Sequence, residues 1–261
     1  MQSYNTLVSI VMPAYNAEET IQESINSVMA QTYKEWELLV VDDGSTDNTG
    51  IIVESYKSSN IKLLSNLYCK GAAGARRTAI EHANGRYIAF LDSDDIWQMT
   101  KLKTQLEFMS TNAVSFVYSD YSTFQDKISN IKSVVLAPTK LSYNDLIKNC
   151  MIGCLTVMLD KTAFKEFDFP FTPKEDYAFW LKLLKQIDFA HKVPNTTSFY
   201  RLASKSLSGN KLKEIKKQWV VVREVEKTSF LRSLYCICYY ACYGAIKHYL
   251  LPIKNRIISK Q

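Results

Sequence analysis

The sequence lacks both a C-x-x-C pair and a secretory signal ahead of its first expected strand, which begins at Leu7. These absences argue against a zinc site built on paired cysteines and against a disulfide framework. We therefore expect the six cysteines to be reduced thiols in a cytoplasmic protein. The 261 residues, 47% hydrophobic and 22% charged, have an ordinary globular composition and can bury a large core.

Acidic side chains are absent from residues 228–261, which carry five Lys or Arg residues. This tail therefore supplies five of the six net positive charges of the chain. Its uncharged run, Ser233–Ile246, contains four tyrosines and is shorter than the about 20 residues that span a bilayer. Two interpretations are open: residues 229–261 lie on an anionic membrane surface, or they form a helix packed on their own domain or on a partner subunit.

Short apolar runs alternate with helical patterns through the first half of the chain. Strands are expected at Leu7–Met12, Trp36–Val41, Ile61–Leu64, Arg86–Leu91 and Val114–Tyr118, and helices at Glu18–Ala30, Thr46–Tyr56, Ala73–Ala83 and Thr100–Met109. This alternation predicts an α/β fold whose mainly parallel, twisted sheet carries helices on both faces. Ligands of such sheets gather beyond the carboxyl ends of the strands, so we expect the site among the residues that follow them.

An acidic cluster, Asp92–Asp95, follows the fourth expected strand. If the chain stays extended through Asp94, Asp92 and Asp94 share one face and Asp95 points the other way. Two converging carboxylates repel unless a cation joins them, and such oxygen ligands favour Mg²⁺ or Mn²⁺. The pattern predicts a metal site at Asp94 with Asp92 beside it. A solvated acidic turn or a helix cap is the alternative, which stays open for Asp95.

A second acidic pair, Asp42 and Asp43, ends the second expected strand. Ser45 or Thr46 could cap the next helix, with Asp47 in its first turn. Asp42 and Asp43 come too early for that role. A carboxylate at the end of a strand can accept hydrogen bonds from a base or a ribose, so we interpret both residues as nucleotide-binding.

Lys70–Arg77 places glycines and small residues ahead of a helix, but it lacks the G-x-G-x-x-G fingerprint of dinucleotide sites. Its free backbone N–H groups could still hold a phosphate, and Arg76 or Arg77 could add a bidentate contact.

Several segments, taken in order, closely resemble the family 2 inverting glycosyltransferases with the GT-A fold, of the bacterial surface-polysaccharide type. They are Val8–Asn16 (VSIVMPAYN), Leu39–Asp47 (LVVDDGSTD), Gly71–Arg76, Gly85–Asp95 (GRYIAFLDSDD), Glu175–Leu181 (EDYAFWL) and Tyr200–Arg201. The resemblance implies a nucleotide-sugar half over residues 1–110, an acceptor and catalytic half of the same domain over 111–210, and a helical, basic and aromatic tail over 211–261.

The resemblance also implies roles for individual residues. Pro13, Ala14, Tyr15 and Asp43 would hold uridine, Arg76 would approach the nucleotide, and Asp94 would bind the metal, with Asp92 near ribose or metal. We add Asp42 and Ser93 to the donor site. The acceptor or diphosphate contacts are expected from Glu175, Trp180, Arg201 and Ser204. The family's histidine two positions after its Tyr-Arg pair is replaced here by Ala203, so its contact is missing or supplied by Ser204 or Ser206.

The choice of catalytic base lies between Glu175 and Asp176. The run from Thr172 to Glu175 has the pattern of a capping box, which would occupy Glu175 in holding the helix start. Asp176 begins an apolar stripe with Phe179 and Trp180, so it should face inward. A buried acid is costly to keep idle, and burial and the helix N-terminus should shift its pKa in opposite directions. We therefore predict that Asp176 is the base.

These features together predict a metal-dependent, inverting hexosyltransferase. A UDP-sugar would be the donor, a glycan or lipid-linked oligosaccharide the acceptor, and Mn²⁺ or Mg²⁺ the cofactor, on the inner face of a membrane and without a nucleic-acid partner. A nucleotidyltransferase and a non-catalytic nucleotide-binding or membrane adaptor are the alternatives. The former would carry a glycine-rich, basic segment after the first strand, where Pro13-Ala14-Tyr15 stands instead. The sequence does not specify the donor sugar or the linkage.

Overall fold

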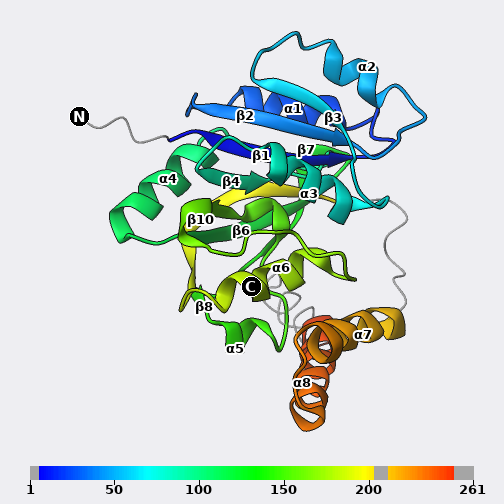
Figure 1. Ribbon diagram of the computed structural model, residues 1–261, viewed down its shortest axis with the longest axis vertical. Helices are drawn as coiled ribbons and strands as arrows, with labels where there is room; N and C mark the ends of the chain where they lie inside the picture. Colours follow the sequence, from blue (N-terminus) through cyan, green and yellow to red (C-terminus); the bar gives the residue numbers. More distant parts are fainter. Residues whose placement is uncertain (1–5, 203–210, 250–261) are drawn as a thin grey trace, which may run out of the picture.

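The computed structural model describes residues 6–202 and 211–249 (Figure 1). The strands are β1 (Val8–Ala14), β2 (Trp36–Asp42), β3 (Ile61–Ser65), β4 (Tyr87–Phe90), β5 (Ile96–Trp97), β6 (Phe116–Gln125), β7 (Lys127–Val135), β8 (Lys140–Leu141), β9 (Met158–Asp160) and β10 (Ala190–Arg201). The helices are α1 (Ile21–Met29), α2 (Thr49–Glu54), α3 (Ala72–His82), α4 (Lys101–Asn112), α5 (Tyr143–Leu146), α6 (Glu175–Leu184), α7 (Lys211–Trp219) and α8 (Phe230–Tyr249). Single-turn segments are η1 (Cys154–Thr156), η2 (Lys161–Ala163) and the π-helical η4 (Val220–Val225).

Within the described residues, the ten strands form one sheet in the order β3-β2-β1-β4-β9-β6-β10-β5, with β7 on β6 and β8 on β10. β3, β2, β1 and β4 are mutually parallel, and β6 pairs in parallel with β10. The antiparallel strand β9 joins β4 to β6. The predicted α/β fold with a mainly parallel sheet is confirmed, and each of the nine expected elements is present with shifted ends.

Helices cover both faces of the sheet because alternate residues of its strands point to opposite sides. On one side, Ile10 and Met12 of β1 pack in a core with α1, α2 and α4. On the other side, Val11 packs in a core with α3, α6, η4 and α8. The carboxyl ends of β1, β2 and β4 therefore meet at one edge of a rigid two-sided layer.

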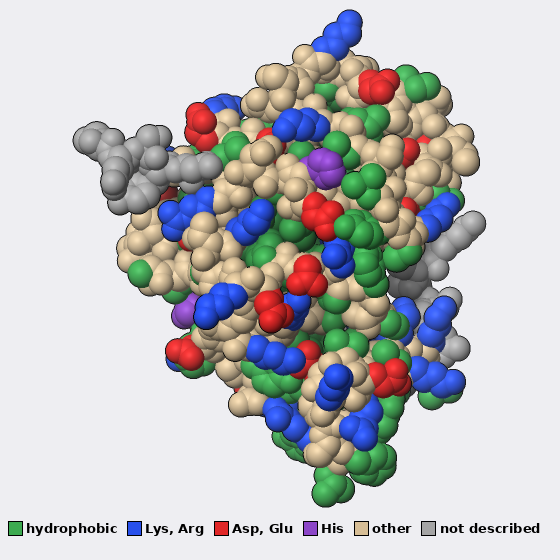
Figure 2. Space-filling view, in the orientation of Figure 1, with side chains coloured by type: hydrophobic (Ala, Val, Ile, Leu, Met, Phe, Trp, Pro, Cys, Tyr) green, Lys and Arg blue, Asp and Glu red, His purple; other side chains and the backbone are tan. Residues whose placement is uncertain are grey.

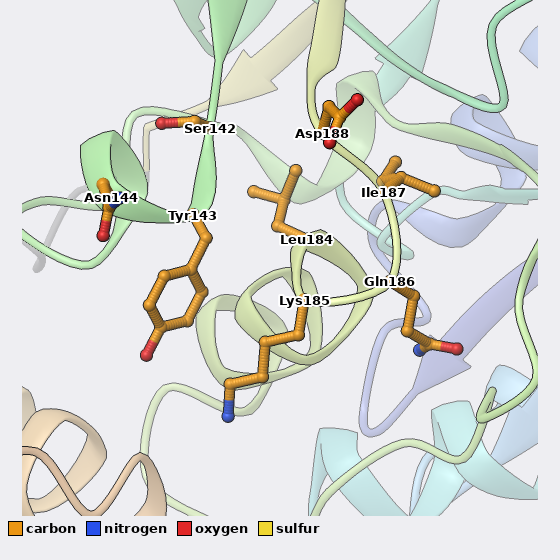
Figure 3. A pocket seen from close by; sticks show the side chains of 8 residues that line it. All are labelled: Ser142, Tyr143, Asn144, Leu184, Lys185, Gln186, Ile187 and Asp188. Carbon is orange, nitrogen blue, oxygen red and sulfur yellow. The ribbon is translucent and has the colours of Figure 1, made fainter.

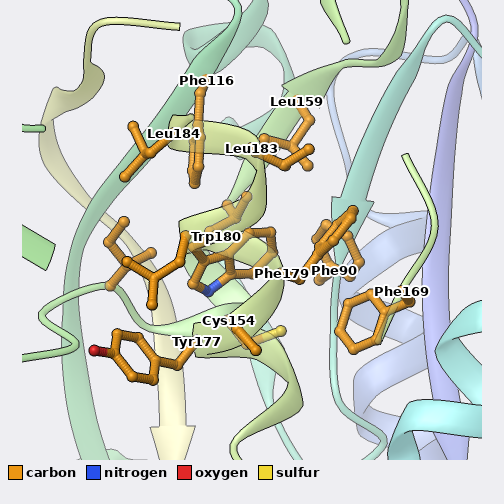
Figure 4. Packing of buried hydrophobic residues seen from close by; sticks show 14 of the residues in the cluster. Phe90, Phe116, Cys154, Leu159, Phe169, Tyr177, Phe179, Trp180, Leu183 and Leu184 are labelled. Atoms are coloured by element: carbon orange, nitrogen blue, oxygen red, sulfur yellow. The ribbon is translucent and has the colours of Figure 1, made fainter. Parts of the chain in front are cut away.

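Aromatic rings fix α6 against the sheet (Figure 4). The ring of Trp180 lies 5.2 Å from that of Phe90 in β4, and Phe179 lies 4.7 Å from Phe169 between ring centroids. Aromatic pairs of this kind contribute about 0.5–1.5 kcal/mol each beyond the area they bury. They anchor α6 near the end of β4, which brings the first turn of α6 close to the carboxyl edge of the sheet.

Two local predictions about loops and caps are wrong. The residue before α6 is Lys174, in the left-handed conformation with φ of 54° and no side-chain cap, so the capping box from Thr172 to Glu175 does not form. The chain also turns after β4 rather than staying extended, since the N–H of Asp95 donates to the carbonyl of Asp92 at 3.1 Å.

The C-terminal helices pack on their own domain while one face of α8 is left exposed. Val221 and Val222 of η4 and Cys236 of α8 are buried in the same core as α6. Figure 2 shows hydrophobic side chains at the lower end of the molecule, where α8 lies, with Lys and Arg side chains nearby. The exposed large hydrophobic side chains in the described part of α8 are Phe230, Leu231, Leu234, Tyr235, Tyr239 and Tyr243. In the described part of the chain, no helix has both the length and the apolar character needed to cross a membrane.

Candidate active site

An open pocket of about 260 Å³ lies at the carboxyl ends of β1, β2 and β4. It is lined by Pro13, Ala14, Tyr15, Asp43, Ala72, Ala75, Arg76, Asp92, Asp94 and Tyr200. The structure thus brings together seven residues that the sequence analysis placed in the donor or metal site, from four separate segments of the chain. All seven residues line this one pocket.

One wall of the pocket is an aromatic and carboxylate surface. Tyr15 is half exposed, and the ammonium of Lys70 lies 4.1 Å from the centre of its ring. The carboxylate of Asp43 accepts hydrogen bonds from the side-chain amide of Asn66 at 2.5 Å and from the N–H of Gly71 at 2.7 Å. An exposed ring face beside a fixed carboxylate can stack on a planar base and accept from its N–H groups.

The start of α3 forms the floor of the pocket. Gly71 has a φ of 123°, a conformation that favours glycine, and this allows its N–H to reach Asp43. At Gly74 a Cβ would lie 2.2 Å from the carbonyl oxygen of Cys69, so only glycine fits there. These two glycines bring the small residues Ala72 and Ala75 to the pocket surface, and the predicted turn into a helix is present.

Arg76 links this pocket to α6. Its side chain is almost fully buried, and its guanidinium donates to Asp92 Oδ1 at 2.6 Å and to Glu175 Oε1 at 2.7 Å. Burial alone would lower the pKa of Arg76, but the negative charges around it, Asp92 first, raise that pKa well above its ordinary value. Arg76 is therefore a permanent cation that joins a carboxylate of the turn after β4 to the first residue of α6.

The acidic turn after β4 divides into exposed and buried carboxylates. Asp94 is exposed and lines the pocket with Asp92. Asp95 is fully buried, and its Oδ1 accepts from the backbone N–H of Arg201 at 2.9 Å. Burial, then the charges of Asp92 and Asp94, raise the pKa of Asp95 well above its ordinary range. The predicted division between the two faces is present, although a turn produces it rather than an extended strand.

Arg201 holds the acidic turn in place instead of facing the pocket. Its guanidinium donates to the carbonyl of Asp94 at 2.8 Å, to the carbonyl of Asp126 at 3.0 Å and to Glu23 Oε2 at 2.5 Å. These contacts use all three of its nitrogens. The expectation that Arg201 contacts acceptor or diphosphate stays a prediction, and in this structure the guanidinium supports the turn that carries Asp94.

Asp92 and Asp94 fit a hard divalent cation only in part. Desolvation, then the neighbouring charge of Asp92, raise the pKa of Asp94, as expected for two carboxylates that face a common point. Within residues 6–202 and 211–249, no cluster of three or more His, Cys, Asp or Glu side chains is arranged to hold a metal. Mg²⁺ typically takes one or two carboxylates and completes its shell with water and substrate phosphates, so this donor set fits a metal–diphosphate complex.

Asp176 lies in the first turn of α6 and has no ion-pair partner among the described side chains. Its Oδ1 accepts from the N–H of Tyr177 at 2.7 Å. Burial raises the pKa of Asp176, the charge of Arg76 opposes this rise, and the charge of Glu175 adds to it. Glu175, by contrast, is bound to Arg76. Among the described residues, Glu175 is therefore the ion-paired acid of the two, and Asp176 has no ion pair.

The remaining assigned residues do not line this pocket or, for Ser204, lie outside the described residues. Asp42 accepts from the backbone N–H and hydroxyl of Ser45 at 3.1 and 2.5 Å, which makes it a turn residue outside the pocket. The carbonyl of Ser93 accepts from Thr20, and its side chain does not line the pocket. Trp180 is 0% exposed in the core and cannot reach an acceptor. Ser204 lies outside the described residues.

The site assignments missed three pocket residues, Ala72, Ala75 and Tyr200, of which Tyr200 is the polar one. It lies edge-to-face with Tyr121, with 6.1 Å between the ring centres. Burial, then the carboxylates of Asp95 and Asp94, raise the pKa of Tyr200 to about 12, so its hydroxyl stays protonated. The Tyr-Arg pair was the available signal, and only its arginine was assigned a site role.

A second hollow, of about 310 Å³, lies between the start of α5 and the loop after α6 (Figure 3). It is lined by Ser142, Tyr143, Asn144, Leu184, Lys185, Gln186, Ile187 and Asp188. None of its residues belongs to the carboxylate pocket, so the two are separate sites.

Comparison with known proteins places the pocket in a family context. The model of Glycosyl transferase family 2 matches residues 9–166. The chain is 50% identical over 250 residues to "UDP-Glc:alpha-D-GlcNAc-diphosphoundecaprenol beta-1,3-glucosyltransferase WfgD" of Escherichia coli, covering 95% of this chain and 97% of WfgD. It is 39% identical over 244 residues to "Putative teichuronic acid biosynthesis glycosyltransferase TuaG" of Bacillus subtilis, covering 92% and 97% of the two chains.

A solved structure shares the fold at low sequence identity. The mannosyltransferase PcManGT of Pyrobaculum calidifontis, in complex with GDP-Man and Mn²⁺, superposes with a TM-score of 0.66 at 16% identity. The match covers 99% of this chain and 80% of PcManGT.

Proposed function

The chain belongs to glycosyl transferase family 2 and is a glycosyltransferase, and we propose that it moves a sugar with inversion from a UDP-sugar to an acceptor hydroxyl. The observation that carries this proposal is the Arg76 bridge. Arg76 forms ion pairs with Asp92, which lines the pocket beside Tyr15, and with Glu175. Glu175 is followed directly by Asp176, which has no ion pair among the described residues. The donor would thus bind on one side of the buried guanidinium of Arg76, and the base that activates the acceptor would lie on the other side.

The donor would lie with its uracil on Tyr15 and its base N–H toward Asp43, in keeping with the exposed ring and the fixed carboxylate there. The diphosphate would then extend toward Arg76 and Asp94. Asp94, with Asp92, would hold Mg²⁺ or Mn²⁺, which supplies positive charge to the leaving diphosphate. The Mn²⁺ complex of PcManGT is consistent with this proposal. The buried charge of Arg76 would stabilise the same leaving group.

Asp176 would act as the general base. Its carboxylate accepts the proton of the acceptor hydroxyl while that oxygen bonds to the anomeric carbon and the bond from this carbon to the diphosphate oxygen breaks. Attack from the face opposite the diphosphate, in one displacement, inverts the anomeric configuration. Asp176 suits this role because it has no ion-pair partner among the described residues, whereas Glu175 has one.

The acceptor would be a lipid-linked saccharide used to build a bacterial surface polysaccharide. The printed names of WfgD and TuaG support this choice, since one acts on a diphosphoundecaprenol-linked sugar and the other belongs to teichuronic acid biosynthesis. The exposed apolar side chains of α8 and the basic tail would hold the enzyme on the inner face of the membrane that carries such an acceptor.

Two measurements test the function. Melting the protein with a panel of UDP- and GDP-sugars, with and without Mn²⁺, should reveal a preferred nucleotide, because a ligand at 100 times its Kd stabilises the fold by about 2.7 kcal/mol. Incubation of the preferred donor with a diphospholipid-linked GlcNAc should yield a disaccharide of inverted anomeric configuration by NMR. Stabilisation by nucleoside triphosphates and release of pyrophosphate would instead indicate a nucleotidyltransferase.

A further inference from the structure

The C-terminal helices contact the chain on both sides of the two acids of α6. Lys174 directly precedes Glu175, and Tyr177 directly follows Asp176. Lys174 has a φ of 54°, a conformation that residues other than glycine rarely adopt. Such a backbone persists only where surrounding contacts hold it. The contacts that hold Lys174 come from α7 and α8, which lie beside α6 in Figure 1.

Gln218 of α7 makes the central contact. Its side chain is 0% exposed, and its Oε1 accepts from Lys174 Nζ at 3.1 Å. Its Nε2 donates to the hydroxyl of Tyr177 at 3.0 Å, and this hydroxyl donates to the carbonyl of Ile147 at 2.7 Å. One buried amide therefore bonds the residues on either side of the acidic pair.

A second contact strengthens the first. The hydroxyl of Tyr240 in α8 lies 3.3 Å from Lys174 Nζ, and the ammonium lies 4.5 Å from the centre of the Tyr240 ring. Glu214 of α7 lies 3.8 Å from the same ammonium. The ammonium of Lys174 thus lies among polar side chains of α7 and α8. Both helices lie beyond residue 166, where the match to the family model ends.

We propose that Gln218 is a positioning residue for the transfer reaction, because it fixes the first turn of α6 and with it the carboxylate of Asp176. This inference rests on the proposed function, in which Asp176 is the base. The side-chain hydrogen bonds of Gln218 go to Lys174 and Tyr177, so it acts on Asp176 through these two neighbours. Its loss should disturb the base and leave the nucleotide wall at Tyr15 and Asp43 intact.

The test compares kcat with UDP affinity in full-length variants. Gln218→Leu removes both hydrogen bonds and should lower kcat by about 100-fold, the order of loss that a base displaced by about 1 Å produces. Affinity for UDP with Mn²⁺ should change little. Gln218→Glu keeps the acceptor for Lys174 and loses the donor to Tyr177, so its kcat should lie between those of Gln218→Leu and the wild type.

The matched control is Asn144→Ala. It removes a different hydrogen bond to the C-terminal helices, the one that Arg232 of α8 donates to Asn144 at 2.7 Å, and leaves the contacts beside Glu175 and Asp176 in place. It should keep wild-type kcat. If Gln218→Leu does not fold, Lys174→Met, which loses only the ammonium, should still show the drop in kcat.

A folded Gln218→Leu with wild-type kcat would overturn the inference, as would a parallel loss of kcat and UDP affinity. An inactive wild type that binds UDP would instead contradict the proposed function, so the two failures are distinguishable.

Discussion

Arg76 is only 5% exposed, and its guanidinium is held by two carboxylates, so each carboxylate is coupled to the other through it. Glu175→Gln keeps a hydrogen-bond acceptor but removes one of the two charges that compensate the buried cation. We expect the free energy of unfolding to fall by about 1–3 kcal/mol, because a hydrogen bond between charged groups weakens to a charge–neutral one.

Thermal melts of Glu175→Gln beside Glu166→Gln check this prediction, since Glu166 is exposed and pairs with the partly exposed Lys182. Equal stability of the two variants would mean that Glu175 does not compensate Arg76. The sequence alone had assigned Glu175 to a capping box. The structure corrects this, because the left-handed Lys174 removes the box and leaves Glu175 to Arg76.

We expect the metal dependence of UDP affinity to require Asp94. Asp94→Asn removes a negative oxygen ligand while keeping the shape of the side chain, so the metal-dependent part of UDP affinity should disappear. Calorimetry with and without Mn²⁺ measures this part directly. The exposed carboxylate Asp188 supplies the control, and Asp188→Asn should bind UDP as the wild type does. Undiminished, metal-enhanced binding by Asp94→Asn would remove Asp94 from the site.

The raised pKa of Asp176 predicts how kcat/KM changes with pH. A base must be deprotonated to act, and burial raises the pKa of this carboxyl even though Arg76 opposes the rise. We therefore expect kcat/KM to fall as the pH is lowered, with an acidic limb that begins at a higher pH than an ordinary aspartate would give. The pH profile of wild-type transfer measures this limb. A profile flat down to the ordinary aspartate range would contradict the assignment.

At the scale of elements, the strands and helices of the first half follow from apolar periodicity. β1 and β2 are buried on both faces and are mostly apolar, with Ser9 and Glu37 as the polar residues inside them, and α1 carries a clear buried stripe. The ends were less predictable. α2 begins at Thr49 rather than Thr46, because Asp47 turns back to accept from the N–H groups of Thr49 and Glu18. Hydrogen bonds between distant loops decide such boundaries, and local patterns do not record them.

Helix α8 packs on the domain through some of its residues and exposes apolar side chains that we propose contact the membrane. Ser233 and Cys236 are buried against the domain, so removal of residues 229–261 would expose core as well as remove any membrane face. The sharper variant is Leu231→Ser with Leu234→Ser, which changes only exposed positions. We expect weaker binding to anionic vesicles, because apolar contact with the interface is lost while the salt-sensitive attraction of the basic tail stays.

Vesicle flotation at low and high salt measures that binding. Leu136→Ser is the control, since Leu136 is 74% exposed and lies beyond β7, outside the C-terminal helices. Wild-type flotation by the α8 double variant would mean that this face of α8 contacts something other than lipid.

At the scale of the whole molecule, one sheet carries the carboxylate pocket at its edge, α6 carries Glu175 and Asp176, and the C-terminal helices lie against α6. Of the seven predicted pocket residues, Asp43, Asp92 and Asp94 were predicted from their places after parallel strands and Arg76 from its place near a helix start. The family resemblance supplied Pro13, Ala14 and Tyr15. It did not predict that α7 and α8 would hold Lys174, since that contact joins segments 44 and 66 residues apart. The division of the chain into halves at residue 110 stays a prediction.

The measurement that tests the central claim most directly is turnover of Asp176→Asn with a UDP-sugar and a diphospholipid-linked acceptor, with UDP affinity recorded beside it. The substitution is nearly isosteric, so the fold and UDP binding should persist. Transfer should fall by about 100- to 10,000-fold, the contribution of a general base. Transfer close to the wild-type rate would contradict the account, because the proton of the acceptor would then have to leave through another group.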